Sequence, residues 1–189
     1  MDQKKLEQAA RLIIEAVGED PKREGLLETP RRFAEMVAEQ LAYAAVPNEE
    51  IARAFDKTFS SPESDMVVVK DISLFSHCEH HIALMYNMKA AVGYIPRGRV
   101  IGLSKIARIA DAVSKRLQIQ ERIGADIRDI MERITGAGDV IVLLEGEHSC
   151  MTARGIRKPG TLTRTISASG RFRTDGDCLL YTSPSPRDS

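Results

Sequence analysis

The chain has 189 residues and a formal net charge of zero, because 27 basic side chains balance 27 acidic ones. This balance gives no global attraction to nucleic acid or to an anionic membrane, so any anion site must be local. No apolar run approaches the roughly 20 residues that span a bilayer, and the first residues lack a signal-peptide core. Three cysteines, two of them near histidines, favour metal chemistry in a reducing compartment over a disulfide framework. We therefore expect a cytoplasmic protein that binds neither nucleic acid nor membrane.

The first 64 residues predict a helical extension. Apolar residues recur at helical spacing across residues 5–17. A second helix is expected to start at Thr29 and Pro30, because a hydroxyl side chain can cap a helix and proline is tolerated at its first position. This helix continues to about Tyr43, and an irregular connector follows. We expect this extension, residues 1–64, to be separate from the part of the chain that carries the chemistry.

From residue 65 the periodicity changes, and residues 65–173 predict a catalytic domain with the element order ββααββ. Strands are expected at about 66–74, 82–95, 139–145 and 161–169, and helices at about 103–117 and 118–135. This order predicts an α+β fold in which two helices pack on one face of an antiparallel sheet. The other face is partly polar, because apolar and charged residues alternate with threonine and serine in the last strand. It therefore needs water or another subunit against it.

The last residues, 174–189, predict a disordered and partly non-native tail. The segment from Cys178 onward has no period, and its Ser-Pro repeats favour disorder. It resembles a translated sequencing adapter. We therefore give Cys178 no functional role.

Two short clusters hold most of the cysteines and histidines. Cys78 and His81 stand three residues apart, and Cys150 lies far downstream. Two thiolates and one imidazole suit zinc, and three protein ligands leave the fourth tetrahedral position open, as in a catalytic site. His80 and His148 then stand beside the ligands as uncommitted bases. The pattern predicts zinc-activated water with acid–base help.

Two other interpretations of the histidines stay open. In one, His80 or His148 is a fourth ligand and the zinc is structural. His148 is the stronger candidate, because it shares one side of an extended segment with Cys150. In the other, His148 is a core histidine. Structural sites usually show paired C-x-x-C or H-x-x-x-H spacing, so the open site is favoured.

Two groups of polar and basic residues could bind an anion. The first is Ser104, Lys105 and Arg108, at a predicted helix start where backbone N–H groups and the dipole favour negative charge. The second is Arg154, Arg157 and Lys158, shortly after the last cysteine of the metal pattern. Each residue singly is better explained as a solvated charge, but together they favour a polyphosphate substrate. The chain has no P-loop, so a nucleotide would be a substrate held by side chains.

Glu121, near the predicted start of the second domain helix, could recognise a base. Its carboxylate could accept hydrogen bonds from an N–H/NH2 edge such as that of guanine. The alternative is a first-turn acid that stabilises its own helix dipole. Glu79 is similarly open between support for a ligand histidine and simple solvation.

Over about residues 5–173 the chain closely resembles GTP cyclohydrolase I. The motifs that carry this resemblance occur in the family's order. They are Gly18-Glu19-Asp20-Pro21, Arg23-Glu24-Gly25-Leu26, Thr29-Pro30, Ser76-His77-Cys78-Glu79-His80-His81, Gly102-Leu103-Ser104-Lys105, Gln118 to Arg122, and His148-Ser149-Cys150-Met151-Thr152-Ala153-Arg154-Gly155. Several independent motifs in one order make a chance match very improbable.

The resemblance implies a T-fold that assembles into a toroidal homodecamer with active sites between subunits. It implies Zn²⁺ as cofactor and GTP as substrate. The implied reaction hydrolyses the guanine imidazole ring, releases formate and gives 7,8-dihydroneopterin triphosphate, the first step of folate or pterin biosynthesis. The rival from another class is a non-catalytic, zinc-stabilised GTP-binding or regulatory protein. A zinc deaminase is disfavoured, because its H-x-E…P-C-x-x-C signature is absent.

The resemblance also implies a role for each site residue. The zinc ligands are Cys78, His81 and Cys150, and the acid–base residues are His80 and His148. Guanine recognition falls to Glu121 with Gln120 beside it. The triphosphate ligands are Lys105, Arg108 and Arg154, with Arg32 as a further basic position that some members use. Ser104 lies at the ribose end.

Overall fold

The computed structural model describes residues 1–174, and the predicted tail lies almost entirely outside them. The chain forms two compact units, residues 1–44 and residues 45 onward. The boundary expected at residue 64 falls inside the second unit. There, helix α3 (Asn48–Ala54) packs on helix α5 (Gln120–Thr135).

The first unit is a pair of packed helices, α1 (Gln3–Ala16) and α2 (Thr29–Gln40), joined through a short 3₁₀ turn (Glu24–Leu26). Asp2 caps α1 by accepting the backbone N–H of Lys5 at 3.1 Å. Both helices lie close to their predicted bounds. Ala10 and Ile14 of α1 and Ala34 of α2 are buried. Such packing stabilises helices of this length, which are marginal in isolation.

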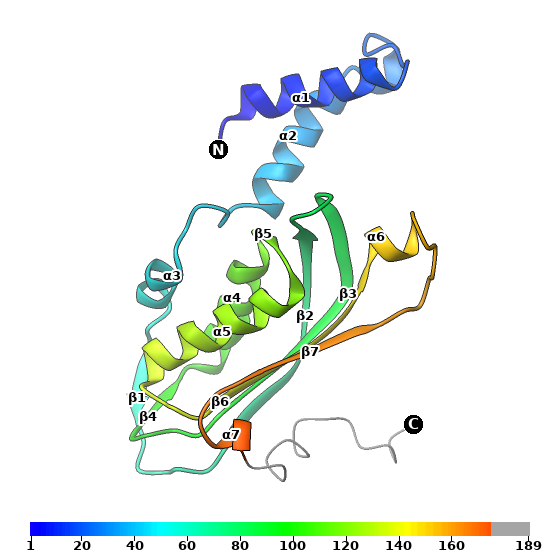
Figure 1. Cartoon of the computed structure of the whole chain (residues 1–189). Coiled ribbons are helices and arrows are strands. Elements are labelled where there is room, and N and C mark those ends of the chain that lie inside the picture. Colours follow the sequence, from blue (N-terminus) through cyan, green and yellow to red (C-terminus); the bar gives the residue numbers. More distant parts are fainter. Residues whose placement is uncertain (175–189) are drawn as a thin grey trace. The chain divides into compact units, whose positions relative to one another are not determined.

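The second unit contains the ββααββ order together with several shorter elements (Figure 1). The elements in addition to α3 and α5 are β1 (Thr58–Ser60), β2 (Val67–Cys78), β3 (Ala83–Tyr94), β4 (Arg99–Ile101), α4 (Leu103–Ser114), β5 (Leu117–Gln118), β6 (Val140–His148), α6 (Ser149–Thr152), β7 (Thr163–Ala168) and α7 (Arg171–Thr174). The sequence patterns did not predict α3, β1, β4, β5, α6 or α7, because such short elements show no clear period. In the part of the chain that is described, no helix is both long and apolar enough to cross a membrane.

Five strands form the main sheet, in the order β5–β2–β3–β6–β7. Neighbouring strands are antiparallel except for β2 with the two-residue β5. Helix α4 packs on β2, and α5 packs on β6 and β7, so both helices cover one face of the sheet (Figure 1). The predicted α+β class and the predicted T-fold arrangement of sheet and helices are confirmed.

The apolar core lies between these two helices and the sheet. Ile106 and Ile109 of α4 and Ile123, Ile127 and Ile130 of α5 have no exposed surface. Their spacing of three or four residues places them on one face of each helix. Burying a side chain of this size contributes about 1.5–3 kcal/mol. This packing fixes the start of α5 against β6 and β7.

The opposite face of the sheet is open, and β7 shows this directly. Arg164 and Ile166 are exposed, whereas Thr163 and Thr165 are half-buried on the helix side. The predicted alternation is therefore confirmed. It leaves an apolar side chain, Ile166, on the uncovered face with 57% of its surface exposed.

A buried carboxylate fixes the end of the described chain. Asp139 is 4% exposed, accepts the backbone N–H of Arg171 at 2.8 Å, and lies 3.5 Å from the guanidinium of Arg97. The hydrogen bond from Arg171, and then the charges of both arginines, hold the pKa of Asp139 below its ordinary value. Gly170 permits this approach, since its φ is +54° and a Cβ there would overlap Asp139 and the carbonyl oxygen of Gly138.

Replacing Gly170 with alanine should destabilise the fold more than the same change at Gly98. Both glycines have positive φ, but a Cβ at Gly98 would meet nothing within 4 Å. We expect Gly98→Ala to cost about 1 kcal/mol of backbone strain, and Gly170→Ala about 2–4 kcal/mol, because it also displaces Asp139. Thermal unfolding followed by circular dichroism measures the difference. Equal midpoints for the two variants would show that Asp139 does not depend on Gly170.

Candidate functional site

Cys78, His81 and Cys150 come together and form what we call the Cys–His–Cys cluster. Their ligand atoms all lie within 4.8 Å of one another, and Cys78 Sγ is 3.9 Å from His81 Nδ1. Cys78 is the last residue of β2 and His81 lies in the following turn. The turn is tight because Ile82 has a φ of +50° and donates its N–H to the carbonyl oxygen of Cys78. Pairing of Met85 in β3 with the end of β6 brings Cys150 alongside.

This donor set fits zinc. Zinc bonds of about 2.0–2.3 Å place tetrahedral ligand atoms about 3.3–3.8 Å apart, close to the 3.9 Å between Cys78 and His81. Burial, and then the neighbouring Cys78 thiol, raise the pKa of the Cys150 thiol. A divalent cation between two such thiols would stabilise both as thiolates. Among residues 1–174, this cluster is the group of cysteine, histidine and acidic side chains placed to hold a metal.

His148 lies next to the cluster at the end of β6 and is half-buried. Its Nε2 is 2.9 Å from Oε1 of Gln120, at the start of α5. Burial lowers the pKa of His148, whereas the charge of Glu121 raises it. The structure thus brings His148 of β6 close to Gln120 and Glu121 of α5, three predicted site residues from two distant segments. His80 lies exposed in the turn after β2, with its ring centroid 6.3 Å from that of His81.

The turn that carries the histidines is attached to the start of α5. Glu79 donates its backbone N–H to the carbonyl oxygen of Gln118 at 2.9 Å. Its carboxylate accepts two hydrogen bonds from the Arg122 guanidinium, at 2.7 and 3.1 Å. An exposed pair of this kind contributes little to stability, because solvent screens it. Its geometry nevertheless gives Glu79, left open from the sequence, a defined partner.

The residues predicted to bind phosphate are distributed over the chain. Arg154 lies beside the cluster, with its Nη1 2.8 Å from Nε2 of His81. Ser104, Lys105 and Arg108 lie in the first two turns of α4. Lys105 places its Nζ 5.8 Å from the centroid of the Phe55 ring. Within residues 1–174, no hydrogen bond or ion pair joins these three to the cluster. Arg32 lies on α2, in the first unit.

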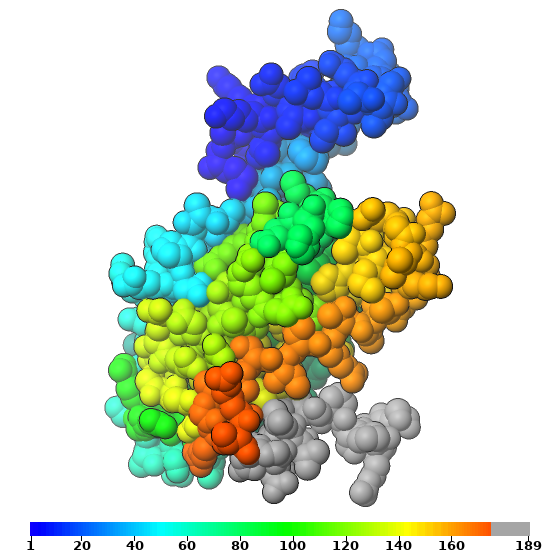
Figure 2. All heavy atoms as spheres, viewed as in Figure 1, coloured from blue at the N-terminus to red at the C-terminus, as the bar shows by residue number. Residues whose placement is uncertain are grey.

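Glu147 anchors the basic segment that follows α6, a role that the sequence patterns did not reveal. Its carboxylate accepts hydrogen bonds from Asn87 at 3.0 Å, from the backbone N–H of Gly160 at 3.2 Å and from Tyr86 at 3.3 Å. The bond from Asn87 is the largest of the causes that hold the pKa of Glu147 below its ordinary value. The anchored segment, residues 153–160, lies on the surface of the second unit (Figure 2). It carries Arg154 at the cluster.

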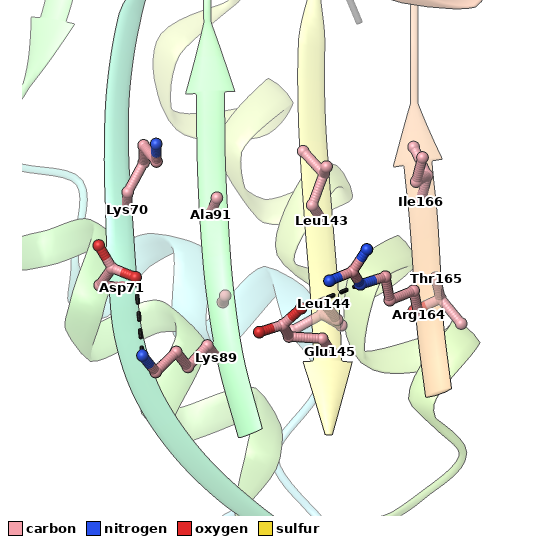
Figure 3. Close-up of a pocket in the computed structure, with 11 residues that line it drawn as sticks. Lys70, Asp71, Lys89, Ala91, Leu143, Leu144, Glu145, Arg164, Thr165 and Ile166 are labelled. Carbon is pink, nitrogen blue, oxygen red and sulfur yellow. Dashed lines mark hydrogen bonds and ion pairs between the residues drawn. The ribbon is translucent and has the colours of Figure 1, made fainter. Parts of the chain in front are cut away.

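A separate hollow lies on the open face of the sheet and contains none of the predicted site residues (Figure 3). Four strands line it, and two ion pairs cross it. Lys89 pairs with Asp71 at 3.9 Å, and Arg164 pairs with Glu145 at 3.1 Å. We place the candidate site at the cluster and not at this hollow, because the hollow offers no group of metal ligands and no histidine.

Removing the Glu147 carboxylate should loosen the basic segment. Glu147→Ala should open the segment locally and make tryptic cleavage after Arg157 roughly fivefold faster at pH 8; the bond after Lys158 precedes Pro159 and resists trypsin. Glu145→Ala is the matched control, since Glu145 lies on the same strand and pairs with Arg164. The pKa of Glu147 is lower in the folded protein than in the unfolded chain. The carboxylate therefore holds the segment fully at a pH above its ordinary pKa, and this hold is lost as the pH falls through the lowered pKa. Equal cleavage of both variants at pH 8 would contradict the anchor.

The comparisons with known proteins identify the family. The model for the family GTP cyclohydrolase I matches residues 6–179. The GTP cyclohydrolase 1 of Clostridium acetobutylicum is 56% identical over 180 residues, covering 93% of this chain and 92% of that protein. The GTP cyclohydrolase 1 of Clostridium botulinum strain Kyoto is 55% identical over 181 residues, with the same coverage. These relatives span nearly the whole chain, so the chain belongs to the GTP cyclohydrolase I family.

Proposed function

We propose that this chain hydrolyses the guanine imidazole ring of GTP with the help of zinc, releases formate and forms 7,8-dihydroneopterin triphosphate. Its family and its relatives named GTP cyclohydrolase 1 support an enzyme with this activity. The observation that carries the proposal is the Cys–His–Cys cluster with His148 next to it. The reaction would supply the first pterin of folate or pterin biosynthesis.

Cys78, His81 and Cys150 would hold the metal. When bound there, zinc supplies Lewis-acid activation that brings the pKa of water toward roughly 7. A fourth, structural ligand would have to be a nearby histidine. His148 is not among the side chains whose ligand atoms lie within 4.8 Å of one another, which supports an open site over a closed one. It also supports an enzyme over the non-catalytic rival.

The two histidines that are not in the cluster would move the protons. His148 would donate a proton to N7 of guanine as water adds to C8, so that the imidazole ring opens. His80, exposed in the turn, would transfer protons during the second hydration, which expels C8 as formate. Ser104 would assist opening of the ribose, after which the sugar carbons rearrange and close onto the freed amine. General acid–base steps of this kind contribute about 10²–10⁴-fold each.

Substrate binding would use both ends of the nucleotide. Glu121 is exposed at the start of α5 and near His148, which suits a carboxylate that accepts hydrogen bonds from the guanine N1–H and amino group. Lys105, Arg108 and Arg154 would bind the triphosphate, because no P-loop is present to do so. Arg32 would be a further phosphate contact.

We also propose a homodecamer with active sites between subunits. Large apolar side chains exposed on the second unit support association, among them Ile82 at 62%, Leu103 at 60% and Ile166 at 57%. Ser104, Lys105 and Arg108 form no bond to the cluster within the described part of one chain, which is the arrangement expected if a neighbouring subunit completes the site. Metal-binding thiols need a reducing compartment, which supports a cytoplasmic location.

Formate release and pterin absorbance should rise together when the zinc-loaded protein is incubated with GTP, and both should vanish when a chelator removes the metal. Formate without pterin would mean that hydrolysis works but rearrangement fails, which points to Ser104. Neither signal, with GTP and zinc still bound, would favour the non-catalytic protein. The control for that last outcome is a version in which the predicted non-native tail, residues 174–189, is replaced by the C-terminus of a relative.

Cys150→Ser should remove both zinc and turnover. The substitution takes one of two thiolates from the cluster, so zinc content by atomic emission should fall from about one per chain to near zero, and formate release with it. Cys178→Ser is the matched control, since Cys178 lies outside the described residues and has no assigned role. Normal formate release by Cys150→Ser would refute the zinc assignment.

A further inference from the structure

Gln120 is a buried glutamine whose side chain is fully engaged. It is 1% exposed, although it stands at the first position of α5 in the candidate site. Its Nε2 amide lies 2.9 Å from the carbonyl oxygen of Thr163, 3.2 Å from that of Leu144 and 3.4 Å from the hydroxyl of Thr165. Its Oε1 lies 2.9 Å from Nε2 of His148. Every polar atom of the side chain therefore has a partner.

These partners fix which way the amide points. Carbonyl oxygens only accept hydrogen bonds, so the NH2 group must face Leu144 and Thr163. The reverse orientation would bury Oε1 against two carbonyl oxygens without a donor, at a cost of about 1–3 kcal/mol or more. Oε1, which only accepts, must then face His148. The contact between Oε1 of Gln120 and Nε2 of His148 therefore requires a proton on Nε2. Nδ1 is then the ring nitrogen that can gain or lose a proton.

Close packing of α5 on the sheet holds Gln120 at this depth. Gly124 lies one turn further along the same helix face. A Cβ at Gly124 would meet Ser167 at 3.3 Å and Leu144 at 3.5 Å, so the absence of a side chain lets the helix approach β6 and β7. Leu144 thus lies against Gly124 and also supplies one acceptor for the Gln120 amide.

The structure assigns Gln120 as a positioning residue that fixes the tautomer of His148, so that the imidazole exchanges protons through Nδ1 alone. This assignment rests on the proposed function for its kinetic consequence, but its structural claim stands on the hydrogen bonds. It replaces the expectation that the Gln120 side chain contacts guanine, because that side chain is buried and each of its polar atoms already has a partner within the protein. Glu121, exposed beside it, keeps the base-recognition role.

Gln120→Met tests the assignment, because methionine keeps the volume and removes the amide. Gln118→Met is the matched control. Gln118 is also 1% exposed and donates to Val113 and Asp126, but its buried Oε1 has no partner within the described residues. Both variants lose a buried amide, and only one loses the contact with His148.

The first measurement is the ring ¹⁵N shifts of ¹⁵N-histidine-labelled protein by solid-state NMR at pH 8.5, where histidine is ordinarily neutral. A His148→Ala sample identifies the His148 signals. We expect the Nε2–H tautomer in the unaltered protein and in Gln118→Met, and its loss in Gln120→Met. The Nδ1–H tautomer in the unaltered protein would overturn the assignment, whatever the variants do.

The second measurement is steady-state formate release. Gln120→Met should lower kcat about 10- to 100-fold with KM for GTP changed less than about twofold, while Gln118→Met keeps a kcat near that of the unaltered protein. A raised KM with unchanged kcat would mean that Gln120 contacts guanine, and the assignment would be wrong. If the unaltered protein releases no formate, the proposed function fails, and the NMR result still decides whether Gln120 fixes the tautomer.

Discussion

The register between β3 and β6 is the constraint on which the candidate site depends. Met85 pairs with His148 and Tyr86 with Glu147, whereas three residues further along β3, Lys89 pairs with Glu145. One extra residue therefore lies in β3, at Asn87, whose φ is +49°. Such a bulge re-aims the strand end. Without it, a slip of one residue would turn the end of β6 to the other face, and Cys150 would leave the cluster.

Two neighbours of the bulge keep it in place. Gly146 lies against Met88, and a Cβ at Gly146 would come within 2.6 Å of the Met88 side chain. A larger residue there would push the strands apart. The Asn87 side chain donates to Glu147, so the residue in the strained backbone conformation also supports the anchor of the basic segment. The bulge residue Asn87 and Gly160 of the basic segment thus share the carboxylate of Glu147.

The sequence predicted the parts of the site that depend on residue type and short spacing. Cys78 and His81 are adjacent in one turn, and the apolar periods located the long helices and strands that deliver Cys150 and His148 to the same end of the sheet. It did not predict the anchoring by Glu147 or the partner of Glu79. Those contacts join residues 13 to 61 positions apart and follow from strand register and a bulge, which no local pattern specifies. Helix α3 was missed because it is only seven residues long.

The environment of Gln120 explains why only an amide satisfies this position. A carboxylate there would face the carbonyl oxygens of Leu144 and Thr163 with no proton to share, unless it stayed protonated. An apolar side chain would leave Nε2 of His148 without this partner in a half-buried place, at about 1–3 kcal/mol. Glutamine alone among the uncharged side chains of this length donates on one side and accepts on the other. The same amide accepts from neutral or charged His148, so proton exchange at Nδ1 leaves the hydrogen bond intact.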